Sequence, residues 1–418
     1  MSSSIKLILK DLFALQRLGI KVGLDHTEEL LKAIGNPHLS LNCIHIAGTN
    51  GKGTTCAIIN KILIESGLTV GLYTSPHLVN FNERIQVNSQ KISDHEIAQF
   101  MAENMVNIKK TNTTFFETTT AMAFDYFNKK SVDIAVIETG LGGRLDSTNV
   151  ISPLVCGITS ISLDHSDILG DTIEKISKEK AGIIKKNIPI YIFEQNENII
   201  EIIKKKSAKV NAPLTIIKSN DVETFTSNDL GSVFKYKGYN IKLPLIGGHQ
   251  VQNCVLAIDI VEFVLNGINE NILKAAISKL SWPGRMEKLS EKNIYYDVAH
   301  NYDGIITTIS SLKSIYKKKP IGLFVMKSDK EANLIIKAVD ERFDKLLLSG
   351  SEENGLMAGS ELAMLFEDHG CANFLLVNNL EMAIDDLRKI SKAQNLPGLI
   401  FGSHYISETV FNKFGILT

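Results

Sequence analysis

The sequence predicts an α/β protein in which two domains each contain a mainly parallel β-sheet. Short apolar runs rich in β-branched residues alternate with amphipathic stretches of helical length, and turn residues separate them. Strands that alternate with helices in this way favour a parallel sheet covered by helices on both faces. Pro283 and Gly284 interrupt the pattern after Trp282, and a second strand–helix series begins beyond them. We therefore expect one domain at 1–283 and a smaller one at 284–418.

In the first domain, the alternation runs from residue 43 onward. The expected strands are 43–47, 69–73, 132–139, 154–159 and 188–193. The expected helices are 52–66, 94–108, 117–129, 172–184, 197–206, 249–266 and 269–280. Between about 214 and 245 the helical pattern lapses, and two β-rich runs flank Lys237 and Gly238. That arrangement predicts a small antiparallel hairpin.

The second domain repeats the pattern of strand followed by helix. The expected strands lie near 293–298, 320–325, 345–348, 373–377 and 398–402, with helices between them. In α/β proteins of this kind, ligands bind at the carboxyl ends of the strands and in clefts between domains. We therefore look for the functional residues at strand ends and in the loops that follow them.

The composition is that of an ordinary globular chain with a sizeable core, since 44% of the 418 residues are hydrophobic and 22% are charged. The formal net charge of −1 argues against binding nucleic acid through bulk charge. No apolar run approaches the roughly 18–20 residues of a membrane span, and Lys6, Lys10 and Asp11 interrupt the stretch where a signal peptide would lie. Five scattered cysteines without a CxxC pair argue against a disulfide framework or zinc site. We expect a cytoplasmic monomer with small-molecule partners, and neither nucleic acid nor membrane.

A glycine-rich loop, GTNGKGT at 48–54, joins the first strand to the first helix. Glycines let backbone N–H groups approach phosphate oxygens, the helix N-terminus attracts anions, and a lysine adds a point charge. The loop departs from the common form G-x4-G-K-[ST], because Ile46 stands at the first glycine position and Gly53 precedes the threonine. It therefore indicates a nucleotide loop of variant type. The candidate nucleotide contacts are Thr49, Asn50, Gly51, Lys52, Gly53 and Thr54.

This variant loop resembles the phosphate loop of folylpolyglutamate synthases and bifunctional dihydrofolate/folylpolyglutamate synthases, members of the Mur ligase superfamily. Mur ligases typically carry Ser or Thr directly after GTNGK, so Gly53 favours the folate branch. The resemblance continues in SPHL (75–78), ERI (83–85), FE (116–117), ETGLGGRLDSTN (138–149), LDH (163–165), EKAGI (179–183), PGR (283–285), DVAHN (297–301) and GS (402–403). It implies a P-loop Mur-ligase-type central domain with a mainly parallel sheet and a smaller C-terminal Rossmann-like α/β domain.

The resemblance also implies ATP and two Mg²⁺ ions. Glu138 ends an apolar strand run, where a carboxylate is offered to a nucleotide's metal. By the resemblance, Ser75 and His165 complete the metal ligands, with Thr54 as a further candidate. Imidazole is an unusual Mg²⁺ ligand, so the assignment of His165 rests on the family alone. The family lysine before Ala-Gly-Ile is carbamylated, which makes Lys180 a candidate for that modification, although a basic helix face is the commoner reading.

The resemblance implies four further site residues, of which Arg285 lies beside the boundary between the two domains. Asn253 resembles the family residue at the adenine edge, although an Asn in the first turns of a helix is often only a cap. Arg285 resembles an arginine that reaches the phosphates, where its cation would neutralise developing charge. Asp297 resembles a nucleotide contact of the second domain, and His300 would orient that site. The implied catalytic set is Lys52, Glu138, His165, Lys180, Arg285 and His300.

For a pterin substrate, two segments match positions that line the family's pteroate pocket. A flat heterocycle favours an apolar or aromatic wall with a few directed hydrogen bonds, and Arg84 would attract a substrate carboxylate. Phe115 and Phe116 could equally be core residues. The implied substrate contacts are Arg84, Thr114, Phe115, Phe116, Glu117, Leu145, Asp146 and Ser147.

The implied activity is that of an ATP-dependent carboxylate–amine ligase. ATP would convert a substrate carboxylate into an acyl phosphate, which the amino group of L-glutamate then attacks. GTNGKGTTC and DVAHN are closest to the bifunctional subgroup, so the expected acceptors are dihydropteroate and tetrahydrofolate glutamates. A folylpolyglutamate synthase without dihydropteroate activity stays open. A P-loop nucleotide switch is disfavoured because no Asn-Lys-x-Asp guanine motif is present, and a wall-peptide Mur ligase is disfavoured by Gly53.

Overall fold

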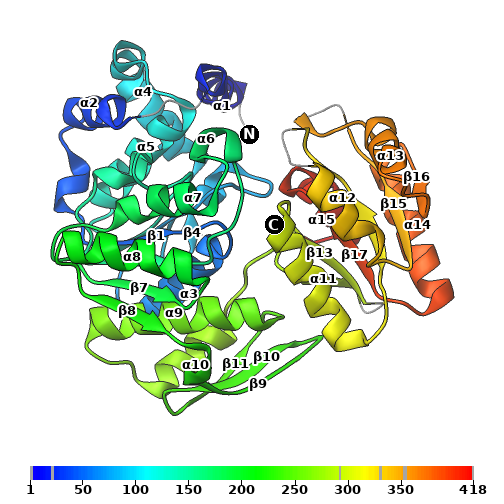
Figure 1. The fold of residues 1–418 in the computed structure, drawn as a ribbon. Coiled ribbons are helices and arrows are strands. Elements are labelled where there is room, and N and C mark those ends of the chain that lie inside the picture. The colour runs from blue at the N-terminus through cyan, green and yellow to red at the C-terminus, as the bar shows by residue number, and fades with distance from the viewer. Residues whose placement is uncertain (1–2, 20–22, 291–292, 329–331, 352–354, 417–418) are drawn as a thin grey trace. The chain divides into compact units, whose positions relative to one another are not determined.

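The computed structural model of the chain describes residues 3–19, 23–290, 293–328, 332–351 and 355–416. It divides into two compact units (Figure 1). The first unit comprises Met1–Ser162, Ser166–Val222 and Gln252–Leu280, and the second comprises Leu163–His165, Glu223–Val251 and Ser281–Thr418. The expected division into domains at 1–283 and 284–418 stays a prediction.

The first unit is built on an eight-stranded sheet of order β4-β3-β2-β5-β1-β6-β7-β8. Its strands are β1 (Cys43–Ala47), β2 (Val70–Tyr73), β3 (Ile85–Val87), β4 (Gln90–Lys91), β5 (Ile134–Glu138), β6 (Val155–Ile158), β7 (Ile190–Phe193) and β8 (Leu214–Ile217). Every neighbouring pair from β2 to β8 is parallel, and β3 and β4 add an antiparallel edge. The four strands β1, β2, β5 and β6 are buried along their whole length, as parallel strands covered on both faces are.

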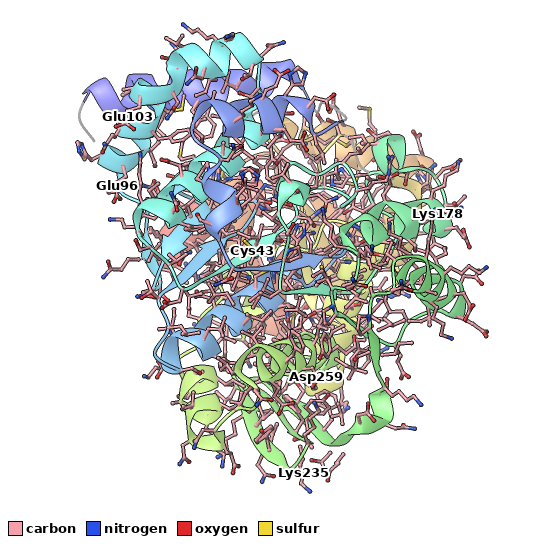
Figure 2. The ribbon with its side chains drawn as sticks, turned by 90° about the vertical axis from the view of Figure 1, so that its left-hand side faces the viewer. Cys43, Glu96, Glu103, Lys178, Lys235 and Asp259 are labelled. Atoms are coloured by element: carbon pink, nitrogen blue, oxygen red, sulfur yellow. The ribbon has the colours of Figure 1, made fainter. Side chains whose placement is uncertain are left out.

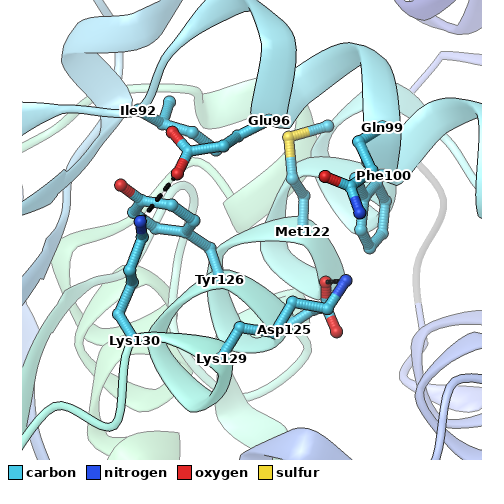
Figure 3. A pocket seen from close by; sticks show the side chains of 9 residues that line it. All are labelled: Ile92, Glu96, Gln99, Phe100, Met122, Asp125, Tyr126, Lys129 and Lys130. Atoms are coloured by element: carbon cyan, nitrogen blue, oxygen red, sulfur yellow. Dashed lines mark ion pairs between the residues drawn. The ribbon is translucent and has the colours of Figure 1, made fainter.

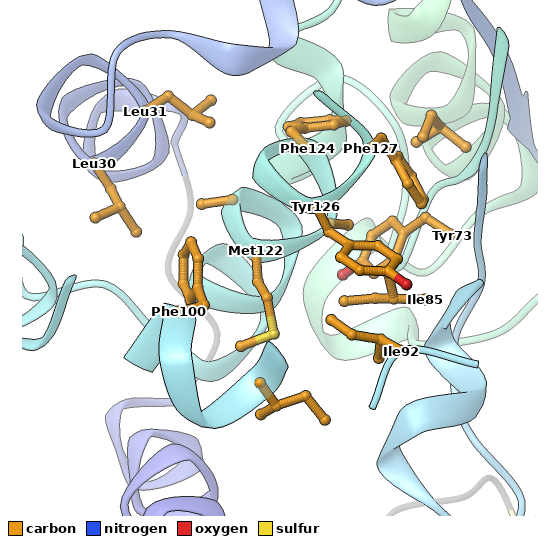
Figure 4. Close-up of a cluster of buried hydrophobic side chains, with 14 of the residues drawn as sticks. Leu30, Leu31, Tyr73, Ile85, Ile92, Phe100, Met122, Phe124, Tyr126 and Phe127 are labelled. Atoms are coloured by element: carbon orange, nitrogen blue, oxygen red, sulfur yellow. The ribbon is translucent and has the colours of Figure 1, made fainter. Parts of the chain in front are cut away.

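The helices of the first unit pack an apolar core between themselves and the sheet. They are α1 (Ser3–Ala14), α2 (Asp25–Ala33), α3 (Lys52–Glu65), α4 (Asp94–Thr111), α5 (Phe115–Lys129), α6 (Ser166–Leu169), α7 (Ile173–Lys180), α8 (Glu197–Lys209) and α10 (Glu270–Ser278), together with α9 (Gly248–Leu265), which begins in the second unit. Side chains of α2, α4 and α5 meet those of β2 and β3 in one buried cluster (Figure 4). Capping boxes at Ser93 and Thr114 fix the starts of α4 and α5.

The second unit contains a six-stranded sheet of order β12-β13-β17-β14-β15-β16, parallel throughout except for the pair β12–β13. Its strands are β12 (Glu287–Ser290), β13 (Ile294–Asp297), β14 (Ile321–Phe324), β15 (Lys345–Leu348), β16 (Phe374–Leu376) and β17 (Gly398–Phe401). Its helices are α11 (Tyr302–Tyr316), α12 (Ala332–Asp340), α13 (Gly359–Asp368), α14 (Leu380–Gln394) and α15 (Ser407–Phe414). A second sheet contains β9 (Val222–Asn228), β10 (Gly231–Tyr236) and β11 (Tyr239–Leu243), and the β10–β11 pair is the hairpin expected around Lys237 and Gly238.

The structure confirms the expected α/β class and its mainly parallel sheets. Each strand expected from an apolar run is present within two residues of its predicted ends. The sequence pattern did not predict the helices α1, α2 and α6 or the strands β3, β4, β8, β9 and β12. None of the helices in the described ranges combines the length and the apolar character that a membrane crossing requires.

Candidate active site

The glycine-rich loop passes from β1 into α3 and packs closely against its surroundings. Gly51 precedes α3 with φ +89°, and a Cβ atom there would collide with the side chain of Asn253. Gly48 has φ +151°, and a Cβ atom there would collide with Thr159. Both positions therefore need glycine, for the backbone conformation as well as for space. Asn253 is 7% exposed and lies against the loop itself; its contact with an adenine stays a prediction.

The segment after β6 holds the first half of the loop in place. The backbone N–H of Thr49 donates to Ser160 O at 2.7 Å, and its hydroxyl donates to Ser162 O at 3.1 Å. The same hydroxyl accepts from Ser162 N at 3.1 Å. Asn50 pairs with Ser160 in an isolated bridge, and its amide donates to Ser162 Oγ at 3.4 Å. The hydroxyl and the backbone N–H of Thr49 are thus both engaged by protein groups, and its contact with a nucleotide stays a prediction.

Lys52 and Thr54 begin α3 beside this loop. The Lys52 ammonium donates to Thr49 O at 3.2 Å, so it lies over the loop backbone. Thr54 is 1% exposed, and its Oγ1 atom has no hydrogen-bond partner among the described residues. A buried hydroxyl without a partner is costly. An oxygen ligand to a cation, or a phosphate oxygen, would satisfy it.

Glu138 lies at the same edge of the sheet as the loop. In the parallel pair β1–β5, Glu138 is the partner of Ile46, so β5 ends where β1 enters the loop. Its side chain is buried at 3% exposure, and Oε2 accepts from Ser75 N at 3.0 Å. The carboxylate and the Thr54 hydroxyl are hard oxygen donors of the kind Mg²⁺ prefers. They therefore fit a nucleotide-bound Mg²⁺, although no group of three His, Cys, Asp or Glu side chains suited to a metal occurs in the described part of the chain.

Lys180 differs from the other lysines of α7 in being buried. Lys178 is exposed on this helix (Figure 2), whereas Lys180 is 3% exposed and donates from Nζ to Gly48 O at 2.7 Å. This bond connects the end of α7 to the glycine loop. The reading of Lys180 as part of a solvated basic face is therefore wrong, because its ammonium lies inside the unit. Its carbamylation stays a prediction.

The loop after β5 is packed onto the turn that contains Lys180. Arg144 N donates to Glu179 O at 2.8 Å, and the Arg144 guanidinium pairs with the Glu179 carboxylate at 2.9 Å. A Cβ atom on Gly182 would collide with the Arg144 backbone, and one on Gly143 would lie 2.9 Å from Lys180 O. The segments GLGGRLDSTN and EKAGI are thus one packed assembly.

Arg84 and the aromatic residues around it form a largely buried cluster. Arg84 is 8% exposed, donates from Nε to His77 Nδ1 at 2.8 Å, and lies 5.3 Å from the centre of the Phe115 ring. Phe13 stacks on Phe115 with ring centres 5.5 Å apart. Burial, followed by the Arg84 cation, lowers the pKa of His77 to about 3, so the imidazole stays neutral. Phe115 belongs to the core, and its part in a pterin pocket stays a prediction.

The other residues of the Thr114–Glu117 segment have structural roles that the sequence analysis did not assign. Thr114 caps α5, and its N–H donates to Glu117 Oε2 at 2.7 Å. The second oxygen, Oε1, is buried without a hydrogen-bond partner among the described residues. Phe116 is half-buried and lies against Gly140, where a Cβ atom would collide with its ring. This places Phe116 beside the loop that contains Asp146.

Asp146 and Ser147 lie at the end of that loop, after the half-buried Leu145. Asp146 is 5% exposed and accepts from Leu141 N at 2.7 Å and from Thr148 N at 3.0 Å. Burial raises its pKa, and these hydrogen bonds oppose the rise. Ser147 Oγ lies 2.7 Å from Thr120 Oγ1 on α5. Both predicted substrate residues are therefore held by buried hydrogen bonds.

In the second unit, one carboxylate faces both predicted catalytic histidines. Asp164 Oδ1 lies 3.9 Å from His165 Nε2, and Asp164 Oδ2 lies 3.7 Å from His300 Nε2. Asn301 also donates to Asp164 Oδ2 at 3.0 Å. The structure thus brings His165 and His300 together around Asp164, whereas Glu138 and Ser75 meet in the first unit. Asp164 is part of the LDH motif at 163–165, but the sequence alone indicated no role for it.

Asp297 and Arg285 shape the turn around β13. Asp297 is 4% exposed and accepts from Met286 N and Ala299 N, each at 2.8 Å. Burial raises its pKa, while the Arg285 cation and these amides act in the opposite direction. Arg285 donates from Nη1 to Gly284 O at 3.1 Å. The carboxylate organises the loop, and nucleotide contact by either side chain stays a prediction.

A surface pocket of about 200 Å³ lies away from these residues, between α4 and α5 (Figure 3). Its lining includes apolar side chains such as Phe100 and Met122, together with the Glu96–Lys130 pair at 2.8 Å and the Asp125–Lys129 pair at 2.8 Å. Burial raises the pKa of Glu96, but hydrogen bonds from Lys130 and Ser93 outweigh this and bring the pKa to about 2. None of the predicted site residues lines this pocket.

Comparison with known proteins places the chain in a family. Residues 46–261 match the Mur ligase middle domain, and residues 284–403 match the glutamate ligase domain of Mur ligases. The dihydrofolate synthase/folylpolyglutamate synthase of Bacillus subtilis (strain 168) is 37% identical over 344 residues, which cover 78% of this chain and 80% of that protein. The chain belongs to the folylpolyglutamate synthase family.

Solved structures of the folylpolyglutamate synthase family share this fold. The Mycobacterium tuberculosis folylpolyglutamate synthase complexed with ADP and AMPPCP has a TM-score of 0.90 and 28% identity over 99% of both chains. A bifunctional folylpolyglutamate synthase/dihydrofolate synthase from Yersinia pestis, complexed with AMPPNP and a Mn ion, has a TM-score of 0.84 and 25% identity, again over 99% of both chains. As a member of this family, the chain is an ATP-dependent ligase.

Proposed function

We propose that this ligase joins L-glutamate to dihydropteroate, forming dihydrofolate, and to tetrahydrofolate glutamates, extending their polyglutamate chain. The observation that supports this proposal best is the edge of the first sheet, where β1 leads into the glycine loop and the unpartnered Thr54 hydroxyl, and where the neighbouring strand β5 ends at the buried Glu138 carboxylate. That edge suits a nucleoside triphosphate with a divalent cation. The choice of acceptors rests on the Bacillus subtilis and Yersinia pestis relatives, whose names include both activities.

The chemistry begins with the binding of ATP at the glycine loop. The loop amides and the N-terminus of α3 would hold the phosphates, and Lys52 would move from Thr49 O onto them. Thr54 and Glu138 would hold Mg²⁺, with Ser75 and His165 as further proposed ligands; the ion supplies charge neutralisation at the phosphates when bound. Lys180, fixed to Gly48 O, would keep the loop in shape or, if carbamylated, add a carboxylate-like group beside it.

Two transfers then follow. A carboxylate oxygen of the pteroate or folate attacks the γ-phosphorus, the bond to the β–γ bridging oxygen breaks, and ADP leaves. The amino group of L-glutamate, as the free amine, attacks the acyl carbon, and inorganic phosphate leaves with the carboxylate oxygen while the nitrogen loses one proton. Arg285 would neutralise charge on the transferred phosphoryl group, and His300, beside Asp164, would orient the second-unit side of the site.

Product analysis tests this proposal. The purified protein is incubated with Mg-ATP and L-glutamate, with dihydropteroate or tetrahydrofolate in parallel, and the products are identified by mass spectrometry. We expect a single glutamyl addition to dihydropteroate and one or more additions to tetrahydrofolate. Addition to tetrahydrofolate alone would instead support a polyglutamate synthase, the single activity named for the Mycobacterium tuberculosis relative. No product with either acceptor would contradict the proposal.

The acyl phosphate has its own test. If the acceptor carboxylate is labelled with ¹⁸O, one labelled oxygen should appear in the released phosphate, because that oxygen bridges carbon and phosphorus in the intermediate. Unlabelled phosphate from a productive reaction would contradict this route.

A further inference from the structure

We propose that His45, a buried residue of β1, is a positioning residue for the acceptor substrate: acting through Thr148, it fixes the carboxylate of Asp146. The inference rests on the proposed function, since Asp146 is there a contact to the pterin. It adds a residue that the motifs of the sequence did not indicate as functional. His45 lies three residues before the glycine loop, in a central strand of the sheet.

The three side chains form a continuous buried chain of hydrogen bonds. His45 Nε2 lies 2.8 Å from Thr148 Oγ1, and Thr148 Oγ1 donates to Asp146 Oδ1 at 2.5 Å. His45 and Thr148 are fully buried, and Asp146 is 5% exposed. These hydrogen bonds thus connect the middle of the sheet to the loop after β5, and the histidine and the threonine are 103 positions apart in the sequence.

The direction of these bonds follows from the number of protons present. Asp146 Oδ1 accepts from both the backbone N–H and the hydroxyl of Thr148, so the single hydroxyl proton of Thr148 lies between Thr148 and Asp146. The Thr148 oxygen then accepts from His45, whose proton must be on Nε2. His45 Nδ1, which has no hydrogen-bond partner among the described residues, is left as the unprotonated nitrogen. If Thr148 instead donated to His45 Nε2, the ring proton would be on Nδ1, where it would be a buried N–H without an acceptor. That arrangement is the costlier one, because buried N–H groups without an acceptor are rare.

A neutral imidazole suits this role. Burial, followed by the positive charge of Lys185, lowers the pKa of His45 to about 3. The Lys185 ammonium is itself fixed, because Nζ donates to Asn149 O at 2.7 Å in the same loop. The imidazole of His45 therefore stays neutral, with one ring proton, at any pH at which the enzyme would work.

Burying a histidine in the apolar strand β1 costs free energy, which indicates that the ring N–H of His45 has a role. The rest of β1 is Cys43, Ile44, Ile46 and Ala47, all fully buried, and an apolar residue at position 45 would avoid an unpaired ring nitrogen. What the histidine adds is one directed bond to Thr148. That bond leaves the Thr148 proton for Asp146, whose other oxygen is held by Leu141 N at 2.7 Å. Asp146 is thereby fixed from both sides.

The experiment compares two substitutions at this position. His45→Gln keeps an N–H close to the place of Nε2, whereas His45→Leu removes the donor at similar volume. We expect His45→Leu to raise the KM for dihydropteroate at least tenfold while the KM for ATP stays within twofold, and His45→Gln to restore most of the loss. His38→Leu is the matched control, because His38 is also a largely buried histidine but lies on η2 (Pro37–Ser40), beside Phe124.

Thr148→Val gives an independent measurement. If His45 acts through Thr148, then the Thr148→Val change and its combination with His45→Leu should raise the dihydropteroate KM equally. Equal losses for His45→Gln and His45→Leu in folded protein, or additive effects in the double variant, would overturn the proposal. ¹⁵N NMR of the wild-type imidazole should place its proton on Nε2, and a proton on Nδ1 would also overturn it. That measurement needs no turnover, so failure of the proposed ligase activity is distinguishable from failure of this inference.

Discussion

A buried hydroxyl without a partner is the residue-scale sign of a missing ligand at the glycine loop. Thr54 Oγ1 is such an atom, at the first turn of α3 and beside the sheet edge where Glu138 lies. Thr54→Val keeps the shape of the side chain and removes the oxygen, whereas Thr54→Ser keeps the oxygen. We expect Thr54→Val to lower kcat about tenfold to a hundredfold and to raise the Mg²⁺ concentration for half-maximal activity, with Thr54→Ser close to wild type.

A magnesium titration of ADP release measures this effect. Thr27→Val serves as the matched control, since Thr27 is another fully buried threonine whose hydroxyl has no hydrogen-bond partner among the described residues, but it lies on α2. An unchanged Mg²⁺ requirement in the Thr54→Val variant would contradict the proposal that Thr54 is a ligand of the metal.

Lys52 carries the second residue-scale prediction. Its ammonium lies over Thr49 O and is the cation at the start of α3 nearest to the loop. Lys52→Met should lower kcat by at least a hundredfold without lowering the melting temperature by more than a few degrees, because the charge serves the phosphates and not the fold. Lys61→Ala, on the same helix, should leave turnover unchanged. A Lys52→Met enzyme with near-normal turnover would contradict the placement of ATP.

The sequence predicted the residues that lie in one continuous motif and missed those that depend on distant segments. The glycine loop and Glu138 were visible because a strand end and its loop are local features. His45 and Asp164 gain their roles only from Thr148 and His300, which lie more than a hundred residues away. The capping box at Thr114 could have been predicted from Thr-x-x-Glu before a helix, but this segment was interpreted only as part of a pterin pocket.

At the scale of elements, the segment GLGGRLDSTN after β5 and the segment EKAGI at the end of α7 form one packed assembly. Gly182 has no space for a side chain, because a Cβ atom would collide with the backbone of Arg144. Gly182→Ala should therefore lower the free energy of unfolding by about 1–3 kcal/mol and reduce activity by shifting the loop that contains Asp146. Urea unfolding and turnover measure the two effects. Gly398→Ala is the control, since the nearest atoms there would be 3.4 Å away, and equal losses in both variants would contradict this packing argument.

The elements that the sequence predicted are those with a continuous buried apolar run, such as β1 and β5. The missed strands are short or exposed: β4 has two exposed residues, and β9 is exposed over most of its length. Their hydrophobic pattern is therefore too weak to distinguish a strand from a loop. Pairing with neighbouring strands determines them, and pairing is not readable from one segment.

At the scale of the whole molecule, buried neutral histidines make stability depend on pH. Burial lowers the pKa of His45 to about 3 and that of His249 to about 4, with Lys185 and Arg285 adding to the respective shifts. The unfolded chain takes up these protons near pH 6.5, so the folded state is favoured fully above that pH and loses stability as the pH falls toward the lowered pKa values. Between pH 7 and pH 5.5, each of these histidines should lower the free energy of unfolding by roughly 1 kcal/mol.

Urea unfolding followed by circular dichroism at pH 7 and pH 5.5 checks this dependence. His45→Gln should lessen the loss on acidification by roughly 1 kcal/mol, because the titrating group is gone. His95→Gln, at an exposed position of α4, should leave the loss unchanged. The raised pKa values of Asp146, Asp297 and Glu287 act in the opposite direction, because each of these carboxyl groups takes up its proton more readily in the folded state. A His45→Gln protein with the wild-type pH dependence would contradict the burial argument.

The central claim is that ATP cleavage by this protein is coupled to amide formation on a pteroate or folate. The most direct test measures ADP and the amide product together, with Mg-ATP, L-glutamate and dihydropteroate, and with each component omitted in turn. The account predicts one ADP for each amide bond, and no ADP above background when the pteroate is absent. ADP release that does not depend on the pteroate, or ADP without an amide product, would contradict it.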